Sequence, residues 1–170
     1  MKTFPVQDDV FSTHAKYSPC KGYRYTLTRK WDAERPTIAF IGLNPSTATE
    51  THDDPTLRRC VNYARAWGAG GLVMLNLFAY RATDPREMKH HDAPVGDKND
   101  QAIKQTCNKA FAVVAAWGNH GPHLGRSEAV LNMLQGVHLF CLGTTKENQP
   151  VHPLYQPLNL KPKTFRGWWE

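Results

Sequence analysis

Four short, continuous apolar runs constrain the fold of this 170-residue chain more than any other feature. They cover residues 37–42, 71–78, 111–117 and 137–142, and polar stretches of helical length separate them. Continuous apolar strands joined by helices are typical of a parallel sheet with both faces covered. The sequence therefore predicts an α/β fold, a three-layer α/β/α sandwich around a central four-stranded parallel sheet.

The segments between and around these runs predict the remaining elements. Residues 23–31 alternate between aromatic and polar types, as a half-buried or edge strand does. Residues 1–20 are polar and predict an irregular N-terminal segment, and residues 1–170 together have a length typical of a single domain. Asp54 and Pro55 carry the capping and first-turn signals of a helix start. Helices are predicted over 54–67, 97–109 and 127–134.

Composition limits the classes of partner and site. The chain has a net charge of +6, which favours an anionic partner such as DNA or a nucleotide. No run reaches the about 18 apolar residues of a membrane span, and the N-terminus has no apolar signal core, so we expect a cytoplasmic protein without membrane contact. The four cysteines are widely spaced and form no C-x-x-C motif. This spacing disfavours zinc ribbons, thioredoxin motifs and closely paired iron–sulfur ligands. We expect no metal and no cofactor.

Residues that build tight loops and form hydrogen bonds lie at or after the end of each apolar run. Ligands of open parallel sheets bind beyond the carboxyl ends of the strands, so these residues are predicted to line one pocket. They are Gly42, Leu43, Asn44, Pro45 and Ser46 at the first run, Asn76 and Arg81 at the second, Trp117 and Gly118 at the third, and His152, Pro153 and Leu154 after the fourth.

This ordered set resembles the uracil-DNA glycosylase superfamily, and in particular a bacterial and phage branch of it. The G-x-N-P sequence at 42–45 resembles the family's first motif, and Asn76 its base-reading asparagine. VVAAWG at 113–118 resembles the third strand, His152-Pro153 the His-Pro loop, and residues 165–169 the aromatic tail. The resemblance covers about residues 35–169, the glycosylase-like core. It implies a DNA glycosylase-like hydrolase that swings an altered or modified base out of DNA and cleaves its N-glycosidic bond.

The resemblance also implies roles for individual residues. A neutral His152 would donate a hydrogen bond to the departing base, Asn44 would position the attacking water, and Asn76 would read the edge of the base. Leu154 or Tyr155 would wedge into the base stack. Asp53 lies beside the predicted pocket and would assist the water, although the Asp53–Asp54 pair is also what a helix start requires.

Two other functions stay open. Asn44 is a poor general base, Ser46 follows the proline where several branches have glycine or tyrosine, and Leu154 replaces the serine usual in the His-Pro loop. These departures favour a non-catalytic module that binds a modified base or nucleotide. The modest net charge fits a third function, a hydrolase of free nucleotides. The expected partner is single- or double-stranded DNA or a nucleotide, and we expect a monomer.

Overall fold

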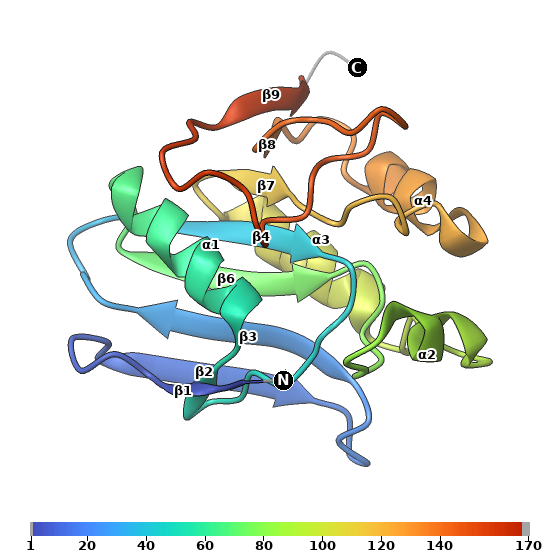
Figure 1. Ribbon diagram of the computed structural model, residues 1–170, viewed down its shortest axis with the longest axis horizontal. Coiled ribbons are helices and arrows are strands. Elements are labelled where there is room, and N and C mark those ends of the chain that lie inside the picture. The colour runs from blue at the N-terminus through green and yellow to red at the C-terminus, as the bar shows by residue number, and fades with distance from the viewer. Residues whose placement is uncertain (1, 168–170) are drawn as a thin grey trace.

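The computed structural model of the protein describes residues 2–167 (Figure 1). In this part of the chain, one mixed sheet has the strand order β2-β3-β6-β4-β7-β8-β9, and β1 and β5 form a separate two-stranded sheet. The strands are β1 (Phe4–Pro5), β2 (Ser12–Tyr17), β3 (Arg24–Lys30), β4 (Thr37–Gly42), β5 (His52–Asp53), β6 (Gly71–Asn76), β7 (Val113–Ala115), β8 (Leu139–Cys141) and β9 (Lys163–Arg166). The helices are α1 (Pro55–Ala66), α2 (Pro85–His90), α3 (Asn99–Lys109), the 3₁₀ helix η1 (His123–Gly125) and α4 (Arg126–Met133).

The predicted three-layer sandwich around a four-stranded parallel sheet is wrong. The four apolar runs form β4, β6, β7 and β8, which pair in parallel, but β3 and β2 continue the sheet antiparallel beyond β6. On the other side, β9 pairs antiparallel with β8. The result is a seven-stranded mixed sheet plus the two-stranded β1–β5 sheet, and the structure is 24% helical.

Within the seven-stranded sheet, the strands that the prediction missed are polar strands near the ends of the chain. β2 falls within residues 1–20, which were expected to be irregular, and β9 lies in the proline-rich C-terminal segment. Both are edge strands of the sheet, with one neighbouring strand each. A strand at an edge needs no continuous apolar run, because solvent reaches much of its surface. Hydrophobicity alone therefore gave no signal for either strand.

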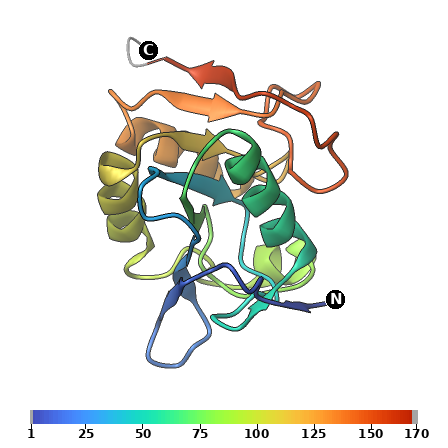
Figure 2. The ribbon, with the colours of Figure 1, turned by 90° about the vertical axis from the view of Figure 1, so that its left-hand side faces the viewer.

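Two apolar cores lie on opposite faces of the sheet. Figure 2 shows α1 on one side of the strands and α3 and α4 on the other. Side chains alternate along a strand, so Ile38 and Phe40 of β4 pack toward α1, whereas Ala39 and Ile41 pack with residues of α3 and α4. Both faces of β4 are therefore buried, which explains why its sequence is continuously apolar.

The helix start at Asp54 is confirmed. The Asp54 side chain accepts a hydrogen bond from the backbone N–H of Leu57 at 2.8 Å, and Pro55 occupies the first turn of α1. The short helix α2 begins with the same signal, since Asp84 caps it and Pro85 follows. This second start was not predicted, because only six helical residues follow it and they carry no apolar period.

The chain leaves the centre of the sheet in opposite directions. From β4 it passes to α1 on one face, and from the adjacent β7 it passes to α4 on the other. Neighbouring strands whose connections diverge leave a crevice at their carboxyl ends, where ligands of α/β proteins bind. Because β3 runs antiparallel to β6, its first residue lies at this same edge of the sheet.

Candidate functional site

A cavity of about 430 Å³ lies at the carboxyl ends of β4, β6 and β7. It occupies the crevice between the diverging connections, and the loop after β8 closes one side. Ten of the residues predicted from the strand ends line this cavity together. They are Gly42, Leu43, Asn44, Pro45, Ser46, Asn76, Trp117, Gly118, His152 and Leu154.

Three predicted residues are not part of the cavity wall. Pro153 is buried beside it, between two residues that do line it. Arg81 places its guanidinium 5.1 Å from the ring centre of Tyr17 and donates a hydrogen bond to the backbone of Lys21. Asp53 is buried away from the cavity. The predicted aromatic tail is only partly visible, because residues 168 and 169 lie outside the described part of the chain.

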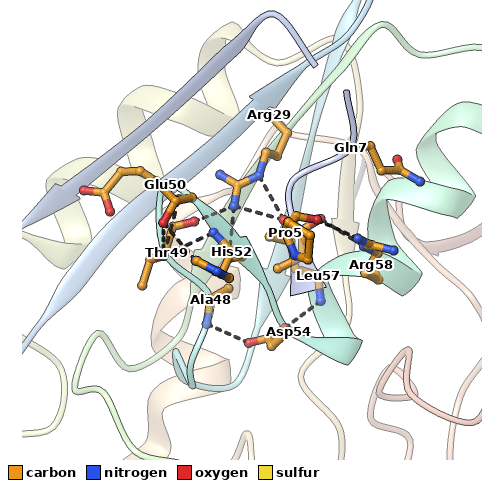
Figure 3. Close-up of polar contacts among 12 residues, drawn as sticks. Pro5, Gln7, Arg29, Ala48, Thr49, Glu50, His52, Asp54, Leu57 and Arg58 are labelled. Atoms are coloured by element: carbon orange, nitrogen blue, oxygen red, sulfur yellow. Dashed lines mark hydrogen bonds and ion pairs between the residues drawn. The ribbon is translucent and has the colours of Figure 1, made fainter. Parts of the chain in front are cut away.

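Asp53 anchors a loop outside the cavity wall. One carboxylate oxygen accepts from Arg29 Nε at 3.0 Å, and the other accepts from Arg58 Nε at 3.1 Å. Arg29 also donates to the carbonyl oxygens of Thr49 and His52, as Figure 3 shows. Asp53 therefore holds the loop before α1 against β3, and it is not among the residues that line the cavity.

Asp54 is the carboxylate that does line the cavity. Its two oxygens accept from the backbone N–H groups of Leu57 at 2.8 Å and Ala48 at 3.2 Å (Figure 3). The side chain thus ties the loop after β4 to the first turn of α1. The sequence pattern predicted the helix cap, but it did not show that the cap also forms part of the cavity wall.

His152 is held as a neutral hydrogen-bond donor. Its Nδ1 accepts from the backbone N–H of Leu154 at 3.2 Å, so the ring proton belongs on Nε2. Burial lowers the pKa of His152, and the nearby Asp54 carboxylate offsets part of that effect. Gly118 turns the chain beside His152 with φ of +72°, where a side chain would be strained. The imidazole is therefore uncharged at neutral pH.

Asn76 reaches across the end of β4, where only glycine leaves room for it. A Cβ atom at Gly42 would lie 2.8 Å from Asn76 Oδ1 and 2.8 Å from the terminal methyl of Met74. The Asn76 Nδ2 atom is buried and has no hydrogen-bond partner within residues 2–167. Such a donor costs about 1–3 kcal/mol when unsatisfied. A ligand with an acceptor atom would remove that cost.

Asn44 presents a fixed acceptor. Its Nδ2 donates to the backbone carbonyl oxygens of Ala82 at 2.8 Å and Pro45 at 3.1 Å. These two bonds use both amide hydrogens and determine which way the amide points. The oxygen Oδ1 is therefore the part of this side chain that can accept a hydrogen bond from a ligand or water.

Sequence reasoning missed Arg24 and Met74 as cavity residues. Met74 is an ordinary member of an apolar strand, so nothing in the sequence distinguished it. Arg24 stands at the start of the aromatic, alternating strand β3, where an arginine reads as a solvent-facing residue. The structure buries it instead, with 3% of its surface exposed, in the cavity wall.

Within residues 2–167, no group of three or more His, Cys, Asp and Glu side chains is arranged to hold a metal ion. In the same residues, no helix has both the length and the apolar character needed to cross a membrane.

Comparisons with known proteins identify a family but no named relative. Searches of curated proteins and of solved structures found no match. The sequence model of a family described as "Protein of unknown function (DUF1643)" matches residues 24–154. The match begins at Arg24 and ends at Leu154, so it includes every residue discussed above as lining the cavity. Because it covers more than half of the chain, this protein belongs to the DUF1643 family.

Proposed function

We propose that this protein is a DNA glycosylase-like hydrolase, which removes an altered or modified base from DNA by cleaving the N-glycosidic bond. One observation carries the proposal. Asn76, whose Nδ2 is buried and has no partner within residues 2–167, lines the same cavity as His152 with its neutral imidazole and Asn44 with its fixed amide oxygen. A donor for the base, a donor for developing negative charge and an acceptor for water are thus available in one site.

In the proposed reaction, His152, Asn76 and Asn44 each contribute one hydrogen bond. The bond between C1′ of the sugar and the base nitrogen breaks, and its electron pair goes to the base. His152 Nε2–H donates to the developing anion, an interaction worth about 3–4 kcal/mol for one well-placed donor. Asn76 Nδ2 donates to a carbonyl oxygen of the base. A water held by Asn44 Oδ1 adds to C1′ and gives up a proton, and the departing base takes up one proton. The products are a free base and an abasic sugar.

This chemistry needs only side chains that the cavity contains. We expect the enzyme to act without a metal or organic cofactor, as a cytoplasmic monomer on single- or double-stranded DNA. The target nucleotide would have to leave the base stack to enter the cavity. Leu154 lines the cavity on the loop after β8 and would occupy the space that the base leaves.

A second candidate is a module that binds a modified base or nucleotide without cleaving it. Both carboxylate oxygens of Asp54 already accept backbone N–H groups. Among the described residues of the cavity wall there is no other carboxylate, and the Asn44 amide is a weak base. Tight DNA binding that survives His152→Ala, with no base released by the unsubstituted protein, would favour this candidate.

The experiment is a base-release assay at enzyme excess. Labelled single- and double-stranded oligonucleotides would carry uracil, hypoxanthine, xanthine or hydroxymethyluracil, and alkali would break the strand at any abasic site. We expect strand breaks with one or more of these bases, abolished in His152→Ala and Asn44→Ala. His14→Ala is the matched control, because His14 is exposed on β2 and outside the cavity. No release from any substrate would overturn the catalytic proposal.

A further inference from the structure

Arg24 is a buried cation without an anionic partner in the described chain. Its Nη1 donates to the backbone oxygen of Ala48 at 3.0 Å, but its Nε is buried and unbonded, and no ion pair within residues 2–167 includes it. The other two buried arginines differ in this respect. Arg29 is paired with Asp53 at 3.0 Å, and Arg126 is paired with Asp100 at 2.6 Å.

A β-bulge directs Arg24 toward the cavity. Lys16 pairs with Thr26, whereas Tyr17 pairs with Arg24, so β3 contains one extra residue, Tyr25, at this point. Without the bulge, alternation would place Arg24 and Leu27 on opposite faces of the sheet. Leu27 packs on the α1 face, and Arg24 reaches Ala48 on that same face. Bulges next to functional sites commonly re-aim a side chain in this way.

The Asp54 carboxylate does not neutralise Arg24 by direct contact. Asp54 lines the same cavity and favours the charged form of Arg24, but both of its oxygens are bonded to backbone N–H groups. Burial lowers the pKa of Arg24 to about 10, so the guanidinium still carries its charge at neutral pH. A buried charge is costly to a fold unless an opposite charge and hydrogen bonds accompany it.

We propose that Arg24 binds a negatively charged oxygen group of the substrate, a phosphate or a carboxylate. The inference rests on the cavity being the substrate site of the proposed function, but it does not require that a bond be cleaved there. The planar guanidinium donates in a fork that matches phosphate and carboxylate oxygens. A base that is uncharged and carries no phosphate into the cavity would leave this donor set and its charge unmatched.

The direct test is to observe the Nε–H signal of Arg24 by NMR of ¹⁵N-labelled protein during titration with inorganic phosphate, and separately with acetate. We expect a saturable shift of the Arg24 signal. The Nε–H of Arg29 is the internal control, because it is equally buried but already bonded to Asp53. An Arg24 signal that does not respond to either anion would overturn the proposal, and this measurement needs no variant to fold.

Two pairs of ligands identify the source of the anion. If the anion is a phosphate of the substrate, thymidine 5′-monophosphate should bind at least about tenfold more tightly than thymidine, as one charge-assisted contact implies. If it is a carboxylate on the base, 5-carboxyuracil should gain similarly over uracil. In Arg24→Gln the gain should disappear, and Arg24→Lys should keep part of it. A gain unchanged in Arg24→Gln would overturn the assignment.

The outcomes separate this inference from the proposed function. Anion binding at Arg24 without any base release would support the inference and overturn hydrolysis. Base release that Arg24→Gln leaves unchanged, together with an Arg24 signal that no anion shifts, would overturn the inference and leave hydrolysis standing.

Discussion

The side-chain oxygen of Asn76 lies 2.8 Å from the point where a Cβ atom at Gly42 would stand. This contact links the end of β4 to the polar group at the end of β6. Gly42→Ala should therefore displace both Asn76 and Met74, and we expect a loss of about 1–3 kcal/mol in the free energy of unfolding, as for other overpacked sites. Urea denaturation measures this loss.

Gly22→Ala serves as the control for that substitution. The added methyl would meet only the flexible Cys20 side chain at 3.3 Å, in the turn between β2 and β3. Gly22→Ala should therefore lower the free energy of unfolding much less than Gly42→Ala does. If the two variants were equally stable, Gly42 would not be required to accommodate Asn76.

The Asn76 Nδ2 group, which is unbonded within residues 2–167, predicts that stability and function respond in opposite directions. Asn76→Leu removes a buried donor that has no partner within the described chain, so the free energy of unfolding should stay unchanged or rise by about 1 kcal/mol. Base release and binding of free bases should be lost. Denaturation curves and the base-release assay measure the two effects on the same sample.

Asn99→Leu is the matched comparison, because Asn99 Nδ2 donates to the backbone oxygens of Asn76 and Leu77, both at 3.0 Å. This variant should lose about 1–3 kcal/mol, since it removes two buried hydrogen bonds, although the Leu77 oxygen keeps its bond from Arg126 Nε at 2.7 Å. Equal destabilisation by Asn76→Leu and Asn99→Leu would mean that Asn76 has a structural role and no free donor.

The lowered pKa of His152 predicts a pH dependence of stability. Burial holds this pKa below its ordinary value of 6.5, so the unfolded chain takes up the proton first as the pH falls. The stability contributed by neutral His152 is thus complete above about pH 6.5 and is lost as the pH falls through the folded pKa. Urea midpoints measured across this range should fall less steeply in His152→Gln than in the unsubstituted protein.

His120 provides the comparison for this pH series, because burial lowers its pKa as well. His120→Gln should keep the part of the slope that His152 contributes. A slope that disappears in His120→Gln and persists in His152→Gln would assign the pH dependence to His120 and contradict the prediction for His152. Proton NMR should also show the His152 ring titrating with a pKa below its ordinary value of 6.5.

The two ion pairs of Asp53 predict a large structural effect of one substitution. Asp53→Asn leaves the fully buried Arg29 without its carboxylate partner. We expect a loss of about 3 kcal/mol, toward the lower end of the range for a broken buried pair, because Arg58 is partly exposed and solvent screens it. Denaturation at neutral pH measures the loss. At a temperature where the variant is folded, base release should stay close to that of the unsubstituted protein, unlike in Asn44→Ala. Complete loss of release by folded Asp53→Asn would contradict this and support a catalytic role for Asp53.

The elements that could be predicted are those with a recognisable sequence pattern, such as a continuous apolar run or a helix-capping signal. β4 is apolar throughout because both of its faces are covered. The start of α1 could be predicted from its N-cap residue Asp54 and from Pro55 in the first turn. The edge strands β2 and β9 have no such pattern, because solvent reaches much of their surface and their side chains can be polar. The mixed sheet could not be predicted without them.

The candidate site divides in the same way. Residues at the ends of apolar strands, such as Asn76, were predicted to line a pocket, and the structure brings them together. Arg24 reaches the cavity because of a β-bulge in β3, the strand that pairs with β6 on the side away from β4. No local sequence pattern predicts that bulge. The adjacent carboxylates Asp53 and Asp54 take opposite directions, and the sequence did not show which one faces the cavity.

The most direct test of the central claim is the detection of free base by mass spectrometry, after a single turnover on oligonucleotides that carry the panel of altered bases. The account predicts that the protein releases at least one intact base, and that Asn76→Leu and His152→Ala, both folded by circular dichroism, release none. Release at the same rate by either variant, or no release by the unsubstituted protein, would contradict it.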